Sequence, residues 1–96
     1  MSRDLQAAPK PSALVGEIIA QARKAAGLNQ TELAARVGRR QSWLSFIETG
    51  EQPCSVSSLV ALARAIGIHP AILCVRYEQS LNRHQPAQDW FRQPPP

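Results

Sequence analysis

Aromatic residues are scarce in this sequence, and long hydrophobic runs are missing from it. Phe, Trp and Tyr make up 5% of the 96 residues, whereas hydrophobic residues make up 44%, so aliphatic side chains and alanine must fill the core. No apolar stretch approaches the roughly 20 residues that a membrane helix needs. The N-terminal residues also lack the apolar stretch of a secretory signal. We therefore expect one small cytoplasmic domain with no membrane partner.

Residues that could hold a metal or carry out catalysis are equally few. Cys54 and Cys74 stand alone, without the spacing of a zinc site or a disulfide framework. We interpret them as reduced core or turn residues, with a redox pair as the alternative. His69 fits the start of a helix, His84 falls in a polar segment, and neither has a partner at metal-ligand spacing. The sequence therefore predicts no enzymatic activity, no catalytic residue, no metal and no cofactor.

Acidic residues are scarce in the segment where basic residues are concentrated. The formal net charge is +4, and an equal surplus lies between residues 23 and 40, where five basic residues face the single acid Glu32. These basic residues are Arg23, Lys24, Arg36, Arg39 and Arg40. A local surplus of positive charge favours a polyanionic partner such as double-stranded DNA.

Apolar residues recur at helical spacing in five segments, and no strand pattern or internal repeat is visible. The expected helices cover about residues 13–26, 30–37, 41–49, 56–66 and 70–80. Before them, residues 1–11 suggest a flexible N-terminal arm, and residues 81–96 form a polar, proline-ended tail. The fold class is therefore all-α, with one compact five-helix domain over residues 12–80.

Capping residues and glycines set the expected ends of these helices. Ser12 and Ser55 are placed to cap the first and fourth helices, and Asn29 with Glu32 has the spacing of a capping box. The residues that should end helices are Gly27, Gly38, Gly50 and Gly67.

The short turn after Gly38 determines how the third helix crosses the second. Only Arg39 and Arg40 separate it from the second helix, so the two must cross sharply, with Ala34 as the small residue at the crossing. Two apolar residues of the third helix, Leu44 and Ile47, should face the core. Its opposite side then carries Ser42, Ser45, Phe46 and Thr49, with Gln41 at the leading end. Short side chains that donate and accept hydrogen bonds suit a close approach to base edges.

Two segments at this turn, LNQTELAARVG (28–38) and QSWLSFIETG (41–50), resemble the phage repressor and Cro type of helix-turn-helix domain, the XRE family. Further along, Leu59, Ala63, Ile66 and Gly67 fit the fourth helix of that family. The resemblance covers about residues 14–73 and implies a lambda-repressor-like domain whose third helix enters the major groove.

Roles for individual residues follow from this resemblance. The positions that would meet bases or the flanking sugar-phosphate are Gln41, Ser42, Ser45 and Phe46. Gln30 falls where the family holds a phosphate and supports the first residue of the recognition helix. Arg23 and Glu48 match a partly buried ion pair that ties the first helix to the end of the third.

This chain departs from the family pattern at three positions. Arg40 stands where a Ser or Thr usually caps the third helix, so a cap is lost and a phosphate-binding cation is gained. Arg39 and Arg40 are both expected to hold phosphates rather than to be ordinary surface charge. Trp43 replaces a small polar residue and is interpreted as a shoulder of the core, with a stacking platform as the alternative. Phe46 replaces a polar residue and could read a thymine methyl or pack on a neighbour.

The resulting hypothesis is a sequence-specific DNA-binding transcriptional regulator, a repressor of prokaryotic or prophage type. One alternative is an antitoxin that also binds a toxin, and another is a protein-interaction module that has lost DNA binding. By resemblance, the expected assembly is a homodimer on a pseudo-palindromic operator.

The candidate dimer surface is the fifth helix, through Ile72, Leu73, Val75 and Tyr77. The aromatics Trp90 and Phe91 in the tail would also gain from docking on a partner. The alternative is that Leu73 and Tyr77 only complete the monomer core.

Overall fold

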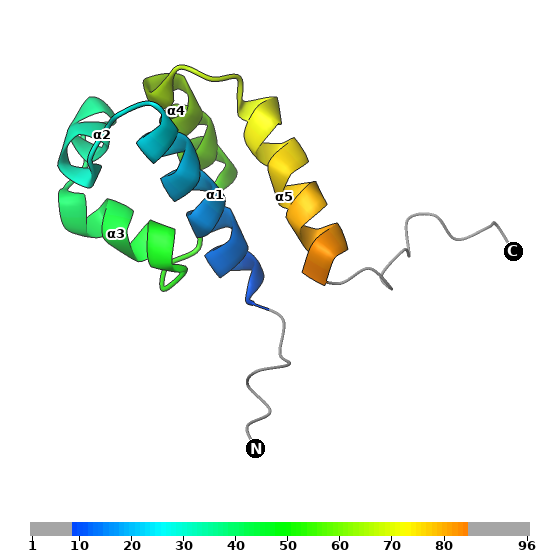
Figure 1. Ribbon diagram of the computed structural model, residues 1–96. Helices are drawn as coiled ribbons and strands as arrows, with labels where there is room; N and C mark the ends of the chain where they lie inside the picture. The colour runs from blue at the N-terminus through cyan, green and yellow to red at the C-terminus, as the bar shows by residue number, and fades with distance from the viewer. Residues whose placement is uncertain (1–8, 85–96) are drawn as a thin grey trace, which may run out of the picture.

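Five helices and no strand make up residues 9–84, the part of the chain that the computed structural model describes (Figure 1). They are α1 (Pro11–Ala25), α2 (Gln30–Arg36), α3 (Gln41–Thr49), α4 (Val56–Ile66) and α5 (Pro70–His84). α1 lies in the middle of the bundle and packs against α3 on one side and α5 on the other, while α4 bridges α1, α2 and α5 (Figure 1). The predicted all-α class is therefore confirmed.

Most of the predicted helix ends are confirmed by the local hydrogen bonds. Asn29 accepts a bond from the Glu32 N–H at 2.8 Å, and Glu32 accepts one from the Asn29 N–H at 2.9 Å, which completes a capping box. Ser55 caps α4 by accepting from the Ser58 N–H at 3.1 Å. Gly38 has a φ of 72°, a left-handed conformation that reverses the chain between α2 and α3 at little steric cost.

The predicted start of α1 is wrong. The helix begins at Pro11, inside the segment assigned to the arm, because proline needs no hydrogen-bond acceptor in the first turn and has a preset φ. Ser12 therefore lies within the helix and does not cap it. Its hydroxyl instead donates to the Gly50 carbonyl at 3.0 Å and so ties α1 to the end of α3.

α5 is longer than predicted and continues to His84. His69 opens it, as expected, because its Nδ1 accepts the Ala71 N–H at 3.0 Å. Ser80, at the predicted end, is buried within the helix. Trp90 and Phe91 lie outside the described residues. Within residues 9–84 no single helix is long and apolar enough to cross a membrane; α4 and α5 reach that length only as a pair bent by 114°.

Aliphatic side chains and alanine fill the core, as the composition requires. The largest fully buried side chains are Leu14, Ile19, Leu33, Leu44, Ile47, Leu62 and Leu73. Ala34 is also fully buried, in keeping with its predicted place at the α2–α3 crossing. Burial of Leu44 and Ile47 fixes the rotation of α3, so the opposite side of that helix faces solvent.

Candidate nucleic-acid interface

The outward side of α3 carries the residues that the helical wheel placed there. Gln41 and Ser42 are exposed, Ser45 is half-buried, and 46% of Phe46 is accessible. Thr49 is exposed but already engaged, because its hydroxyl lies 3.2 Å from both the Phe46 carbonyl and Glu51 Oε1. Of the predicted polar face, the N-terminal half is the part with hydroxyls and amides directed to solvent.

Behind this face, Arg23 and Glu48 form the predicted ion pair. Arg23 Nε lies 2.7 Å from Glu48 Oε2, and Arg23 Nη2 lies 3.0 Å from Oε1, so the pair is bidentate. The side chains are only 9% and 6% exposed, so burial is more complete than the partial burial expected from the sequence. Arg23 also donates to the Leu28 carbonyl at 2.9 Å. The hydrogen bond to Glu48 raises the pKa of Arg23, against the opposing effect of burial.

The ion pair continues through two glutamines to the start of α3. Gln30 Nε2 donates to Glu48 Oε1 at 2.8 Å. Gln41 Nε2 in turn donates to Gln30 Oε1 at 2.6 Å. This chain of contacts, which we call the relay, consists of Arg23, Glu48, Gln30 and Gln41. It joins the core to the first residue of α3, in agreement with the supporting role that the resemblance implied for Gln30.

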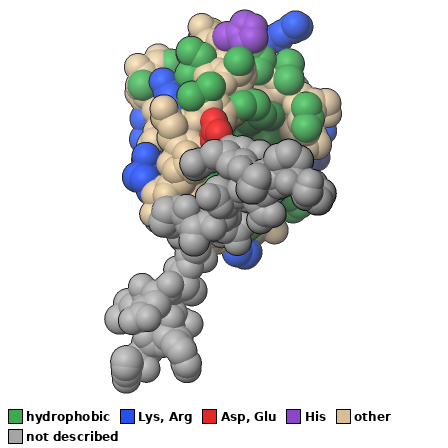
Figure 2. Space-filling model, turned by 90° about the vertical axis from the view of Figure 1, so that its right-hand side faces the viewer, with side chains coloured by type: hydrophobic (Ala, Val, Ile, Leu, Met, Phe, Trp, Pro, Cys, Tyr) green, Lys and Arg blue, Asp and Glu red, His purple; other side chains and the backbone are tan. Residues whose placement is uncertain are grey.

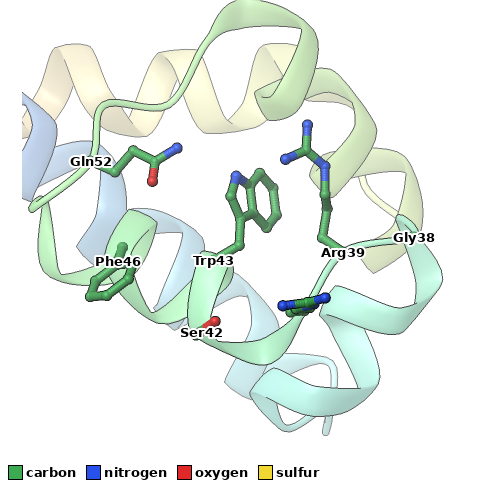
Figure 3. Close-up of a pocket in the computed structure, with 7 residues that line it drawn as sticks. Gly38, Arg39, Ser42, Trp43, Phe46 and Gln52 are labelled. Atoms are coloured by element: carbon green, nitrogen blue, oxygen red, sulfur yellow. The ribbon is translucent and has the colours of Figure 1, made fainter.

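A hollow of about 420 Å³ opens beside the outward face of α3. Figure 3 shows Trp43 in its centre, Arg39 on one side and Phe46 with Gln52 on the other. The complete lining is Gly38, Arg39, Arg40, Ser42, Trp43, Phe46 and Gln52. No acidic residue lines the hollow, and its two arginines are exposed, so the hollow suits an anion flanked by apolar groups.

Trp43 is a shoulder of the core, as expected, and it also contacts Arg39. It is half-buried and packs against the core. The guanidinium of Arg39 lies over its ring, 4.8 Å from the centroid, which is the geometry of a cation–π contact. The predicted core packing of Trp43 is thus confirmed, and its exposed part supports the side chain of Arg39.

Not every basic residue of segment 23–40 is available to a partner. Arg23 is buried in the ion pair, and Arg36 donates to the Ala65 carbonyl at 2.9 Å, which links α2 to α4. Arg40 occupies the N-cap position of α3 without a side-chain cap bond, so the predicted loss of the cap is confirmed. Arg39 and Arg40 are both exposed, and they carry positive charge at the start of α3.

The far side of the bundle carries an apolar surface on α5. Ile72 is 42% exposed and Val75 50% exposed, whereas Leu73 is buried and Tyr77 half-buried. Figure 2 shows hydrophobic side chains gathered on this face near the histidine. Of the four predicted dimer residues, Leu73 is therefore committed to the core, and Ile72 and Val75 are the ones that point outward.

The two cysteines are both free thiols. Cys54 is half-buried beside the core, and burial raises the pKa of its thiol to about 11. Cys74 is exposed on α5. Within residues 9–84, no group of three His, Cys, Asp or Glu side chains lies close enough together to hold a metal ion.

Comparison with known proteins places this geometry among DNA-binding domains. The profile of the family described as "Helix-turn-helix domain" matches residues 14–72. The chain is 42% identical over 55 residues to the "Uncharacterized HTH-type transcriptional regulator y4dJ" of Sinorhizobium fredii, a match that covers 57% of this chain and 71% of that protein. It is also similar to the solved structure of an "XRE-family like protein from Pseudomonas syringae pv. tomato str. DC3000", with a TM-score of 0.65 and 36% identity over 72% of this chain and 84% of that one.

A third similarity is to an enzyme. The chain is 33% identical over 72 residues to the cyanate hydratase of a Synechococcus species. The match covers 75% of this chain but 47% of the enzyme, so the chain spans about half of that protein. A match of this extent supports a shared domain and carries no conclusion about the activity of the whole enzyme.

Proposed function

Because this chain belongs to the helix-turn-helix family and is an XRE-like DNA-binding transcriptional regulator, we propose that it acts as a repressor that reads a specific duplex sequence. α3 lies in the major groove, with its outward side against base edges. Repression requires only that the bound protein covers a promoter.

The observation that carries this proposal is the outward face of α3. Gln41 and Ser42 are exposed and polar, while Leu44 and Ile47 anchor the opposite side in the core. A glutamine amide can pair with adenine in a bidentate manner, and serine hydroxyls can donate to or accept from any base. An anchored helix with such a face meets the geometric requirement for reading sequence.

Phosphate contacts come from residues on both sides of that face. Arg39 and Arg40 lie at the start of α3, and within residues 9–84 neither has a carboxylate at ion-pair distance. Gln30, at the start of α2, lies on the same side because it bonds to Gln41. We assign these three residues to the DNA backbone, where they set the register without reading sequence.

A second copy of the chain completes the site. α3 has nine residues and spans about 13 Å, enough for only a few base pairs. Two-fold dimerisation places two such helices about one helical turn apart on a pseudo-palindromic operator. Ile72 and Val75 on α5 supply exposed apolar surface on the far side of α1 from α3, where it stays clear of the DNA (Figures 1 and 2). A toxin bound at this face is the alternative outcome.

Selection from a random duplex pool tests the proposal directly. The parent protein should enrich one sequence, and the double variant Gln41→Ala/Ser45→Ala should lose preference for it while it stays folded. A bidentate base contact contributes about 1–3 kcal/mol of discrimination. Ser57→Ala, at an exposed serine of α4, is the control.

Titration at two salt concentrations separates this function from its main rival. A DNA-binding protein loses affinity steeply as salt rises, because each phosphate contact releases counterions. An interaction module that has lost DNA binding would bind duplex weakly at both concentrations and would enrich no sequence.

A further inference from the structure

The side-chain amide of glutamine can present itself in two ways. Its oxygen accepts hydrogen bonds and its NH2 group donates them, and a half-turn about the last bond exchanges the two. Which way an amide faces is therefore decided by its partners. For Gln41, at the start of α3, the orientation decides what the side chain offers to a base.

Glu48 determines the orientation at the inner end of the relay. A carboxylate only accepts hydrogen bonds, and both oxygens of Glu48 are already engaged by Arg23, at 2.7 and 3.0 Å. Gln30 approaches Oε1 at 2.8 Å, and only its NH2 group can bond there. A reversed amide would place oxygen against oxygen beside a side chain that is 6% exposed.

This constraint is passed on to Gln41. With its NH2 group directed to Glu48, Gln30 presents its oxygen at the other end, and Gln41 Nε2 donates to that oxygen at 2.6 Å. Gln41 is left with one N–H and with Oε1, and neither has another partner within residues 9–84. One donor next to one acceptor matches adenine, which offers N7 as acceptor and N6 as donor in the major groove.

We infer that the buried Arg23–Glu48 pair is a determinant of base specificity, because it holds Gln41 in the orientation that prefers adenine to guanine. The inference rests on the proposed reading of DNA by α3. Guanine offers two acceptors, O6 and N7, so Gln41 could match it only with two N–H groups free. That requires Gln30 to turn round, which Glu48 opposes. Glu48 is thus a positioning residue that acts on a base it does not touch.

Two substitutions break the relay in different ways. Gln30→Met keeps a side chain of similar length but removes both polar atoms, so Gln41 can turn freely and its preference for adenine over guanine should fall. Glu48→Gln removes the carboxylate that obliges Gln30 to donate. The new amide oxygen can accept at only one of the two carboxylate positions, so its NH2 group faces an Arg23 N–H in either orientation. When that NH2 group lies on the Gln30 side, Gln30 turns round, donates to Gln41 Oε1 and leaves two N–H groups for guanine.

The experiment compares duplexes with adenine or guanine at one position. That position is the one where Gln41→Ala abolishes the sequence preference of the parent protein. The parent should prefer adenine by roughly tenfold or more, as expected for a bidentate contact. In Gln30→Met the ratio should fall to about threefold or less, and in Glu48→Gln guanine should gain relative to the parent. Thermal melts establish that each variant is folded under the binding conditions.

Glu51→Gln is the matched control, because it removes the same charge from an exposed carboxylate just after α3 that contacts neither glutamine of the relay. It should keep the ratio of the parent. A folded Glu48→Gln protein that also keeps that ratio would overturn the inference while leaving the proposed function intact, whatever the result for Gln30→Met. A parent protein that prefers guanine to adenine at this position would also overturn the inference and leave the proposed function intact. A parent that enriches no sequence overturns the proposed function and this inference with it.

Discussion

Gly16 in α1 packs directly against the backbone of Ile47 in α3. A β-carbon at Gly16 would overlap the carbonyl oxygens of both Ile47 and Glu48. α1 and α3 therefore meet backbone to backbone, with no side chain between them. Since Glu48 belongs to the relay, this contact also sets the distance between α1 and the residues behind the reading face.

Replacing Gly16 with alanine should destabilise the protein. In an exposed helix this change would stabilise by up to about 1 kcal/mol, because alanine is the better helix former. Here the added methyl meets backbone atoms that cannot turn aside, and overpacking of this kind costs about 1–3 kcal/mol. Thermal or urea unfolding of Gly16→Ala measures the balance. A variant as stable as the parent, or more stable, would contradict the proposed backbone contact.

Residues whose roles depend on neighbours in sequence were predictable from the residues themselves. Contacts between helices were predicted only at Ala34 and, through the family resemblance, for Arg23 with Glu48 and for Gln30. The capping box at Asn29 and the turn at Gly38 follow from spacing within a few residues. Gly16, by contrast, looks like a weak point within an apolar helix until α3 is in place. Ser12 shows the same limit, because its bond to Gly50 spans 38 residues and no local pattern reports it.

Charge was overestimated for a related reason. All the basic residues from Arg23 to Arg40 counted equally in the sequence. In the fold, Arg23 is neutralised by Glu48, an acid outside that segment, whereas the bond from Arg36 to a backbone carbonyl of α4 leaves its charge in place. The two sides of α3 were predictable in detail. Once Leu44 and Ile47 are assigned to the core, the helical repeat alone determines which residues of α3 face solvent.

Removing either partner of the Arg23–Glu48 pair should destabilise the fold strongly. The charge left behind is buried and uncompensated, at a cost of about 3–5 kcal/mol when burial is complete. Exposures of 9% and 6% place this pair near that limit. Urea unfolding of Arg23→Ala, Glu48→Ala and the double variant gives the coupling energy. Glu17→Ala, at an exposed acid of α1, should change little. Single variants that unfold at the same urea concentration as the parent would show that the pair contributes nothing to stability.

Arg39 should contribute to DNA affinity in two separable ways. Arg39→Ala removes one phosphate neutralisation, so the slope of log affinity against log salt should fall by about one unit for every duplex. Arg39→Lys keeps the charge but loses the planar stack on Trp43, so the slope should stay while affinity falls a few-fold, as expected for about 0.5–1 kcal/mol. Arg83→Ala, at an exposed arginine of α5, is the control. A loss confined to the operator would mean that Arg39 reads a base.

Cys54 should react slowly with alkylating reagents. The reactive form is the thiolate, and burial raises the pKa of this thiol from 9.0 to about 11. Folding therefore favours the neutral thiol, and the stability linked to this group is present below pH 9 and lost as pH rises through about 11. In a Cys74→Ser background, the labelling rate should keep rising towards pH 11, whereas the chain unfolded in urea should level off near pH 9. Equal profiles in the two states would show that Cys54 is not shielded.

Charge on the apolar face of α5 should weaken the proposed homodimer. Ile72 is 42% exposed, and at a dimer interface a glutamate in its place would be buried without a partner, which opposes association. Val56→Glu is the matched control, since Val56 is 78% exposed at the start of α4, outside the proposed interface. Truncation after Tyr77 is a poor test, because α5 continues to His84 and Ser80 is buried. Sedimentation equilibrium over a range of concentrations should show a weaker dimer for Ile72→Glu and an unchanged one for Val56→Glu. A parent protein that stays monomeric both free and on its operator would rule out the dimer, and with it the two-fold reading of DNA.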